Sequence, residues 1–170
     1  MRKELWIDSA TELKCIHSIG EALTKAGYNA SNSVVVTVST DYSSIAGQII
    51  RHTLTYEGEI ADGFGVDVPY PDQVWDTRFV NEACSMFMLH RDAIGVKNII
   101  LVEAGVIRGS NYKSLINLIR TSLEMDNPII TTSLYENKHS AFKCDYIAEY
   151  YDDETQDLTF WWEKENNHWK

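Results

Sequence analysis

A short central segment contains several side chains that suit the binding of an anion. Glu103 ends a strongly apolar run, and a helix is predicted to begin a few positions later. At that helix start, Arg108 can make a charge-assisted hydrogen bond, and Gly109 lets the backbone approach a ligand closely. Ser110 and Asn111 add side-chain donors beside a helix N-terminus, which itself favours negative charge. The segment predicts a phosphate-binding loop; the alternative is an ordinary capped helix start.

The runs around this segment predict an α/β fold with a mostly parallel, twisted sheet flanked by helices. Buried strands are indicated by apolar, β-branched runs at 33–39, 98–102 and 129–134. Helical patterns alternate with them and cover 9–26, 43–50, 79–90 and 112–123. Such alternation is typical of parallel strands joined by right-handed crossovers. Ligands of open α/β sheets bind beyond the carboxyl ends of the strands, where Glu103 and the loop after it are expected.

The N-terminal helix has its own start and stop signals. Ser9 and Glu12 form a capping box, which predicts Ser9 as the N-cap residue. Leu13 and Ile16 begin the apolar stripe that we expect to face the core. Gly27 supplies the C-terminal stop.

Other parts of the chain carry less regular patterns. Glycines and prolines punctuate residues 54–77, where we expect a hairpin or an excursion away from the main sheet. The segments 146–151 and 158–162 are predicted as closing strands near the C-terminus. No internal repeat, low-complexity tract or linker interrupts the pattern, so we expect one domain over residues 1–170.

Composition and charge narrow the possible classes of function. The chain has 170 residues, of which 44% are hydrophobic, enough to bury a core. Its formal net charge of −10 disfavours nucleic-acid binding, because an acidic surface repels phosphate backbones. No apolar stretch approaches the roughly 18 residues of a membrane span, and no export signal is visible. We therefore expect an acidic, cytoplasmic protein with neither membrane nor nucleic-acid partners.

The cysteines and histidines indicate neither a disulfide framework nor a zinc site. Cys15, Cys84 and Cys144 are odd in number and far apart, so reduced thiols are expected. No histidine lies near a cysteine at metal-ligand spacing. No structural metal is predicted.

Two adjacent tryptophans near the C-terminus predict a contact. In an alternating strand, one of Trp161 and Trp162 must face away from the sheet's own core. An exposed tryptophan often marks an interface with a partner. The alternative is packing on the N-terminal helix.

The central segment resembles the ribose-phosphate-binding signature of type I phosphoribosyltransferases. That signature begins with an apolar strand, two acidic residues and a short loop. A four-residue motif follows, in which a small hydroxyl residue and glycine come first and threonine comes last. Residues 99–112 follow this order. Residues 33–47 occupy the place of the family's first strand and pyrophosphate loop, and residues 54–77 the place of its flexible loop. The resemblance covers residues 33–163 and implies a phosphoribosyltransferase-like fold.

The C-terminal part is similar to the purine-using branch of this family, which acts on xanthine, guanine and hypoxanthine. In that branch a strand carries a lysine, an Asp-Tyr pair follows, and a last apolar strand ends in tryptophan and an acid; residues 130–163 follow this order. The resemblance implies that Lys138 or Lys143 contacts the base, together with Trp162. For an active enzyme it also implies that Glu103 binds the ribose hydroxyls through magnesium.

Several positions depart from the family's pattern at the groups that carry the reaction. The second acid has become Ala104, and a third is replaced by Ile107. Arg108 and Asn111 replace the first and last hydroxyl residues of the phosphate loop. Asp41 lies in the pyrophosphate loop, where a basic residue is expected, and would repel a diphosphate.

These departures predict a phosphoribosyltransferase-like protein with an altered active site. We expect a pseudoenzyme that binds a phosphate-bearing nucleotide or phosphoribosyl ligand, and that senses this ligand or engages a protein partner or a second copy of itself. The residues expected to hold the ligand are Glu103, Arg108, Gly109, Ser110 and Asn111. Two alternatives stay open. One is an active, magnesium-dependent purine phosphoribosyltransferase, a pentosyltransferase using phosphoribosyl pyrophosphate; the other is a protein-interaction module with an empty site.

Overall fold

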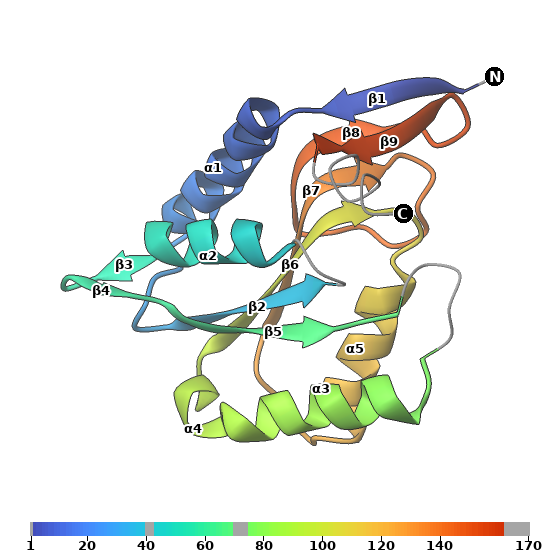
Figure 1. The fold of residues 1–170 in the computed structure, drawn as a ribbon. Helices are drawn as coiled ribbons and strands as arrows, with labels where there is room; N and C mark the ends of the chain where they lie inside the picture. The colour runs from blue at the N-terminus through green and yellow to red at the C-terminus, as the bar shows by residue number, and fades with distance from the viewer. Residues whose placement is uncertain (1, 40–42, 70–74, 162–170) are drawn as a thin grey trace.

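A five-stranded parallel sheet forms the centre of the structure, a computed structural model that describes residues 2–39, 43–69 and 75–161 (Figure 1). Its spatial order is β5-β2-β6-β7-β8, and every neighbouring pair is parallel. The strands are β2 (Ser33–Ser39), β5 (Asp62–Asp67), β6 (Asn98–Val106), β7 (Ile129–Asn137) and β8 (Tyr146–Tyr151). The predicted α/β class with a mostly parallel sheet is confirmed.

Helices cover both faces of this sheet and enclose two apolar cores. One face packs against α1 (Ser9–Lys25) and α2 (Ser43–Thr53), and the other against α3 (Thr77–Leu89) and α5 (Ser110–Thr121), with the short α4 (Arg91–Ile94) following α3. The strands predicted as apolar runs lie between these two layers, because side chains that alternate across a strand need an apolar partner on each face. No helix among the described residues has both the length and the apolar character needed to cross a membrane.

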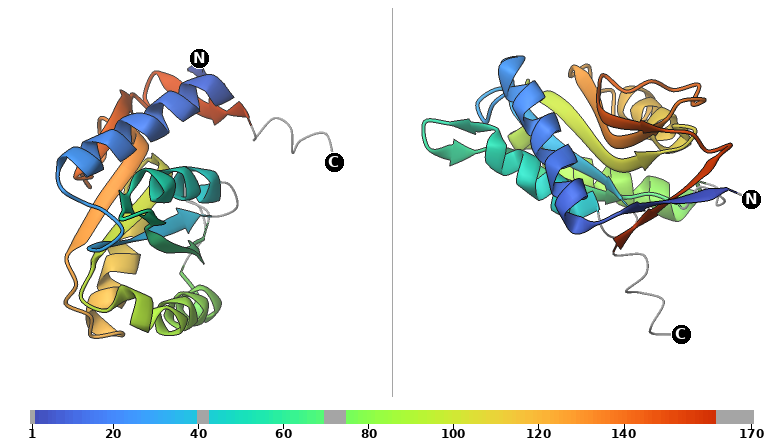
Figure 2. Two further views of the ribbon diagram at one scale, coloured as in Figure 1. Left: turned by 90° about the vertical axis from the view of Figure 1, so that its left-hand side faces the viewer. Right: turned by 90° about the horizontal axis from the view of Figure 1, so that it is seen from above.

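A separate two-stranded sheet lies beside the carboxyl ends of β6 and β7. It pairs β1 (Lys3–Ile7) in parallel with β9 (Gln156–Phe160), and Figure 2 shows the two strands side by side. The Phe160 ring meets the Tyr135 ring of β7 edge to face at 5.8 Å. The closing strand predicted at 158–162 is therefore displaced, and it does not join the main sheet. Its partner β1 was missed, because pairing between the two ends of the chain leaves no local pattern.

The start of α1 differs from the predicted capping box. Asp8 is the N-cap residue, and its carboxylate accepts a hydrogen bond from the Thr11 backbone N–H at 2.7 Å. Glu12 is instead buried and accepts a hydrogen bond from the Trp161 side chain at 2.6 Å. This contact is one of the two alternatives that the tryptophan pair predicts. The helix is turned accordingly, so that Leu13, expected in the core, is 42% exposed.

The stretch predicted as irregular, residues 54–77, contains a hairpin, as predicted. The chain after the hairpin nevertheless joins the main sheet. The hairpin pairs β3 (Thr55–Tyr56) with β4 (Glu59–Ile60), and the chain then returns as edge strand β5. Phe64 and Val66 of β5 are buried against α3. Glycine at 63 fits within this strand, because a Cβ there would lie 2.6 Å from both the Arg51 Cδ and the Val35 carbonyl oxygen.

Candidate functional site

The candidate site lies where the order of strands across the sheet reverses. From β2 the chain crosses through α2 to β5 on one side, and it later enters β6 on the other side of β2. In open α/β sheets, such a reversal leaves room for a ligand beyond the carboxyl ends of the two strands. β6 continues to Val106, further than the predicted strand end, and the loop to α5 begins there.

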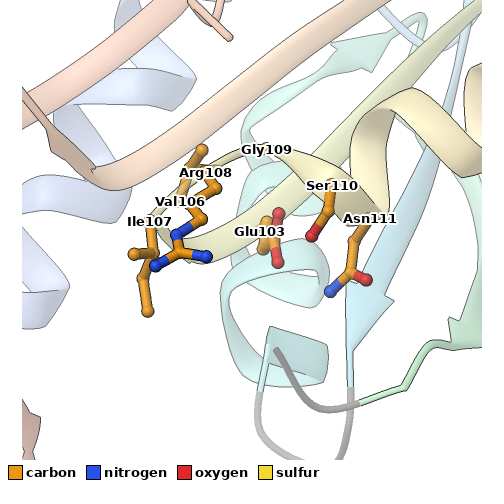
Figure 3. Close-up of a pocket in the computed structure, with 8 residues that line it drawn as sticks. Glu103, Val106, Ile107, Arg108, Gly109, Ser110 and Asn111 are labelled. Atoms are coloured by element: carbon orange, nitrogen blue, oxygen red, sulfur yellow. The ribbon is translucent and has the colours of Figure 1, made fainter. Parts of the chain in front are cut away.

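A pocket of about 360 Å³ opens at this edge of the sheet (Figure 3). Small-molecule sites span roughly 300–1,000 Å³, so the pocket is large enough for a compact ligand. Its described lining residues come from the end of β6, the loop after it and the start of α5: Glu103, Gly105, Val106, Ile107, Arg108, Gly109, Ser110 and Asn111. The structure therefore brings together all the residues that the sequence predicts for phosphate and ribose binding.

Helix α5 begins without a side-chain cap. Its N-cap residue is Gly109, in the left-handed conformation with φ 70° and ψ 21°. Helices α1 and α3 begin instead with Asp8 and Asp76, whose carboxylates accept hydrogen bonds from first-turn backbone N–H groups. Among the described residues, the first N–H groups of α5 have no such acceptor, and they lie at the pocket, where an anion could accept their hydrogen bonds. The two interpretations of this segment, a phosphate-binding loop and an ordinary capped helix start, both remain compatible with a glycine N-cap.

Two residues from the end of β7 and the loop after it brace the loop between β6 and α5. The Asn137 side-chain amide donates a hydrogen bond to the Ile107 carbonyl at 3.2 Å. Phe142 packs against Gly109, and its ring lies 5.3 Å from the ring of Tyr112 in α5. Neither contact could be predicted from the sequence, because Asn137 and Ile107 are 30 positions apart and no motif links them.

Glu103 projects into the pocket and is half-buried (Figure 3). Burial raises its pKa from the ordinary value of 4.5 to about 8, and a hydrogen bond from the Asn111 side chain offsets only part of this effect. Asn111 also donates to the Pro69 carbonyl at 3.4 Å, which ties the start of α5 to the segment after β5. At neutral pH the Glu103 carboxyl is therefore mostly uncharged.

Three titratable groups near Glu103 are also uncharged at neutral pH. Burial raises the pKa of the Tyr112 hydroxyl well above its usual 10, and that hydroxyl donates to backbone carbonyls of β6 and β7. Burial likewise raises the pKa of the Cys144 thiol, with a further contribution from the nearby Glu136 carboxylate. The pKa of Tyr151 rises to about 12 for the same main reason. These three side chains therefore add no charge beside Glu103.

Arg108 supplies the positive charge of the pocket. Figure 3 shows Arg108 on one side of Glu103, and Ser110 and Asn111 on the other. The Arg108 side chain is exposed, and it forms no ion pair with any other residue that the structure describes. Its guanidinium can therefore turn toward an anion without breaking an existing bridge.

The positions where the resemblance expects further acids carry no negative charge. Ala104 faces the opposite side of the sheet, where it is 5% exposed in the core beneath α1 and α2. Ile107 lies at the pocket and is 39% exposed. Asp41, the acid in the predicted pyrophosphate loop, lies outside the described residues.

The lysines predicted to contact a base already have carboxylate partners. Lys138 pairs with Asp152 at 3.4 Å, and Lys143 pairs with the fully buried Glu136 at 3.0 Å. Neither lysine is among the described residues that line the pocket. Trp162 lies outside the described residues. The assignment of these residues to base binding stays a prediction.

Comparison with known proteins identifies the fold. No family model matches the sequence, and no curated protein matches it. Solved structures do match: a purine phosphoribosyltransferase from Pyrococcus horikoshii Ot3 has 14% identity and a TM-score of 0.64, over 94% of this chain and 93% of that chain. A xanthine-guanine-hypoxanthine phosphoribosyltransferase from Helicobacter pylori has 11% identity and a TM-score of 0.62, over 96% and 97%.

A third similar structure is a hypothetical protein from Neisseria gonorrhoeae with bound ppGpp. It has 15% identity and a TM-score of 0.68, over 99% of this chain and 96% of that chain. All three alignments span nearly the whole of both chains at low identity, which shows a shared fold. The chain has the phosphoribosyltransferase-like fold that the sequence resemblance implies.

Proposed function

We propose that the pocket at the carboxyl end of β6 binds the phosphate of a nucleotide, and that the protein binds this ligand without transferring a phosphoribosyl group. The observation that carries the proposal is the uncapped start of α5 beside Arg108. There no side chain of the N-cap residue accepts from the backbone N–H groups, and the Arg108 guanidinium, which has no ion pair among the described residues, lines the same pocket. Both features favour an anion in a protein that is otherwise strongly acidic.

The uncharged state of Glu103 supports the same ligand. A carboxylate in this position would repel a phosphate at short range. Because burial holds the pKa of Glu103 at about 8, the carboxyl carries a proton at neutral pH and can donate a hydrogen bond. The pocket then offers donors at the protonated Glu103, Arg108 and the start of α5, a set that matches a phosphate.

The nucleotide part of the proposal rests on the fold neighbours. Among them are two purine phosphoribosyltransferases and a protein with ppGpp bound. A ligand site at the same reversal of strand order suits a purine nucleotide with one or more phosphates. We infer this class of ligand for the present chain and a sensing or protein-interaction role for the complex.

The missing acids argue against ordinary phosphoribosyl transfer. Transfer requires an enzyme to position a diphosphate leaving group and to stabilise its developing charge. Ala104 is turned into the opposite core and Ile107 is apolar, so neither can bind a ribose hydroxyl or hold a cation. Positive charge and backbone donors, which bind a phosphate in the ground state, are the groups that remain.

Calorimetric titration combined with a turnover assay tests this function. We expect guanosine 5′-monophosphate (GMP) to bind, and we expect no pyrophosphate release from phosphoribosyl pyrophosphate with guanine, hypoxanthine or xanthine. Pyrophosphate release that depends on magnesium would instead support the alternative of an active phosphoribosyltransferase. A folded protein that binds neither GMP nor phosphoribosyl pyrophosphate would leave the protein-interaction module as the better account.

A further inference from the structure

The pocket's donor set does not suit the magnesium that the fold family implies. Magnesium prefers oxygen ligands in octahedral geometry, supplied by carboxylates, phosphates and water. Glu103 is the one carboxyl among the described residues that line the pocket. The neighbouring position, Ala104, is buried on the other face of the sheet, and Ile107 at the pocket has no ligand atom in its side chain.

The surroundings of Glu103 further disfavour a cation. A carboxyl must lose its proton to ligate a metal, and burial opposes that loss here. The hydrogen bond from the Asn111 amide favours the charged form of the carboxyl, but it offsets only part of the effect of burial. The nearby side chains of Tyr112, Cys144 and Tyr151 stay uncharged, so they add no negative charge to attract a cation.

Arg108 already supplies positive charge to the same pocket. A divalent cation placed beside Glu103 would lie near this guanidinium, and the two positive groups would repel each other. Among the described residues that line the pocket, one carboxyl group is present to balance the charge of both. Glu136, a nearby acid, is fully buried and paired with Lys143, so it is not available to a metal in the pocket. Arg108 and the α5 N–H groups take the electrostatic role that a cation would have.

We propose that this pocket binds its phosphate ligand without a divalent cation, and that Arg108 and the start of α5 take the cation's place. This inference rests on the proposed nucleotide binding and specifies how the site achieves it. It departs from the magnesium-assisted binding that the sequence resemblance implies for an active enzyme. Arg108 provides the positive charge, and the start of α5 provides backbone donors.

The test compares GMP binding with and without magnesium. GMP is titrated calorimetrically into the wild-type protein and into Glu103→Gln, once in excess EDTA and once in saturating magnesium chloride. Glutamine has the size of glutamate and is always uncharged, and its amide donates hydrogen bonds. For each protein we expect the dissociation constants with and without magnesium to agree within about threefold.

The outcomes separate this inference from the proposed function. Binding that is weakened about tenfold or more in EDTA, and that loses its magnesium dependence in Glu103→Gln, would overturn the inference and leave nucleotide binding intact. No GMP binding in either medium, from protein with native circular dichroism, would instead overturn the proposed function itself.

A direct measurement of metal binding provides a second readout. Manganese(II), a paramagnetic substitute for magnesium, is titrated in the presence of GMP and followed by electron paramagnetic resonance. We expect the wild-type protein and Glu103→Gln to bind equal amounts of manganese. Any weak binding at the exposed group of His139, Asp152 and Glu154 is common to both proteins and cancels in the comparison. Bound manganese that disappears in Glu103→Gln would contradict the inference.

Discussion

Gly109 lies directly against Phe142, so the start of α5 is shaped by a residue from the loop between β7 and β8. A Cβ added to Gly109 would overlap the Phe142 Cβ and lie 2.6 Å from its Cγ. Gly109 also has a positive φ of 70°, which L side chains rarely adopt. Glycine is required here for two reasons, and the shape of the anion-binding loop depends on both.

Replacement of Gly109 by alanine is expected to destabilise the protein and to abolish GMP binding. The left-handed backbone and the overlap with Phe142 together cost about 2–4 kcal/mol of unfolding free energy. The measurement is urea denaturation followed by circular dichroism, with calorimetry on the folded fraction.

Gly27→Ala is the matched control for this substitution. Gly27 also has a positive φ, of 95°, but a Cβ there would have no neighbour within 4 Å. It is expected to lose only about 1 kcal/mol and to bind GMP normally. Equal losses in the two variants would show that contact with Phe142 does not shape the loop.

GMP binding is expected to weaken as the pH rises through about 8. The pKa of Glu103 lies near this value, so the carboxyl is uncharged below it and negative above it, next to the bound phosphate. The phosphate itself does not change charge in this range, since its second pKa is about 6. Calorimetry at a series of pH values checks this, and Glu103→Gln should remove the dependence. Affinity that stays constant across pH 8 in the wild type would place the phosphate away from Glu103.

The free energy of unfolding should also depend on pH through the raised pKa of Glu103. The carboxyl titrates near 4.5 when unfolded and near 8 when folded, so the folded state holds the proton between these values and loses stability as the pH rises. The Glu103→Gln variant does not lose this stability, because glutamine has no carboxyl group to titrate. Its stability advantage over wild type should be small below pH 4.5 and reach roughly 1–3 kcal/mol at pH 8, allowing for partial exposure of the side chain. Denaturation curves at both pH values measure it; a constant difference would contradict the raised pKa.

The contact between Trp161 and Glu12 is expected to stabilise the attachment of β9 to α1. Trp161→Phe removes the donor and leaves the buried Glu12 carboxylate without it, at a cost of about 1–3 kcal/mol. Adding Glu12→Leu to that variant removes the buried carboxylate that has lost its hydrogen-bond donor, and it should restore part of the lost free energy of unfolding. Urea denaturation of the single and double variants gives the coupling energy. Additive losses would show that the hydrogen bond contributes nothing to stability.

Local patterns were enough to predict the three central strands of the main sheet and the loop of the candidate site, although the edge strand β5 was expected to leave the sheet. The runs 33–39 and 98–102 are strongly β-branched because both faces of β2 and β6 are covered by helices. The residues from Arg108 to Asn111 are consecutive, so one segment carries most of the pocket. Features of this kind need no long-range contact to be recognised.

Contacts between distant parts of the chain could not be predicted in this way. The brace from Asn137 and Phe142 reaches the loop from the far end of β7 and the loop after it, and the β1–β9 pair joins the two ends of the fold. The protonation of Glu103 is equally invisible in sequence, because it depends on how closely α5 and the neighbouring strands surround the carboxyl. The placement of the N-cap at Asp8 rather than Ser9 shows how two adjacent capping residues compete, and backbone geometry decides between them.

The central claim is that Arg108 and the start of α5 hold the phosphate of a nucleotide. The most direct measurement is calorimetric titration of GMP into wild type, Arg108→Ala and the control Arg91→Ala. Arg91 is an exposed arginine in α4, at the amino end of β6, on the opposite edge of the sheet from the pocket. The account predicts that Arg108→Ala loses about 1.5–3 kcal/mol of binding free energy, more than tenfold in affinity, while Arg91→Ala binds as wild type does. GMP affinity unchanged by Arg108→Ala would contradict it.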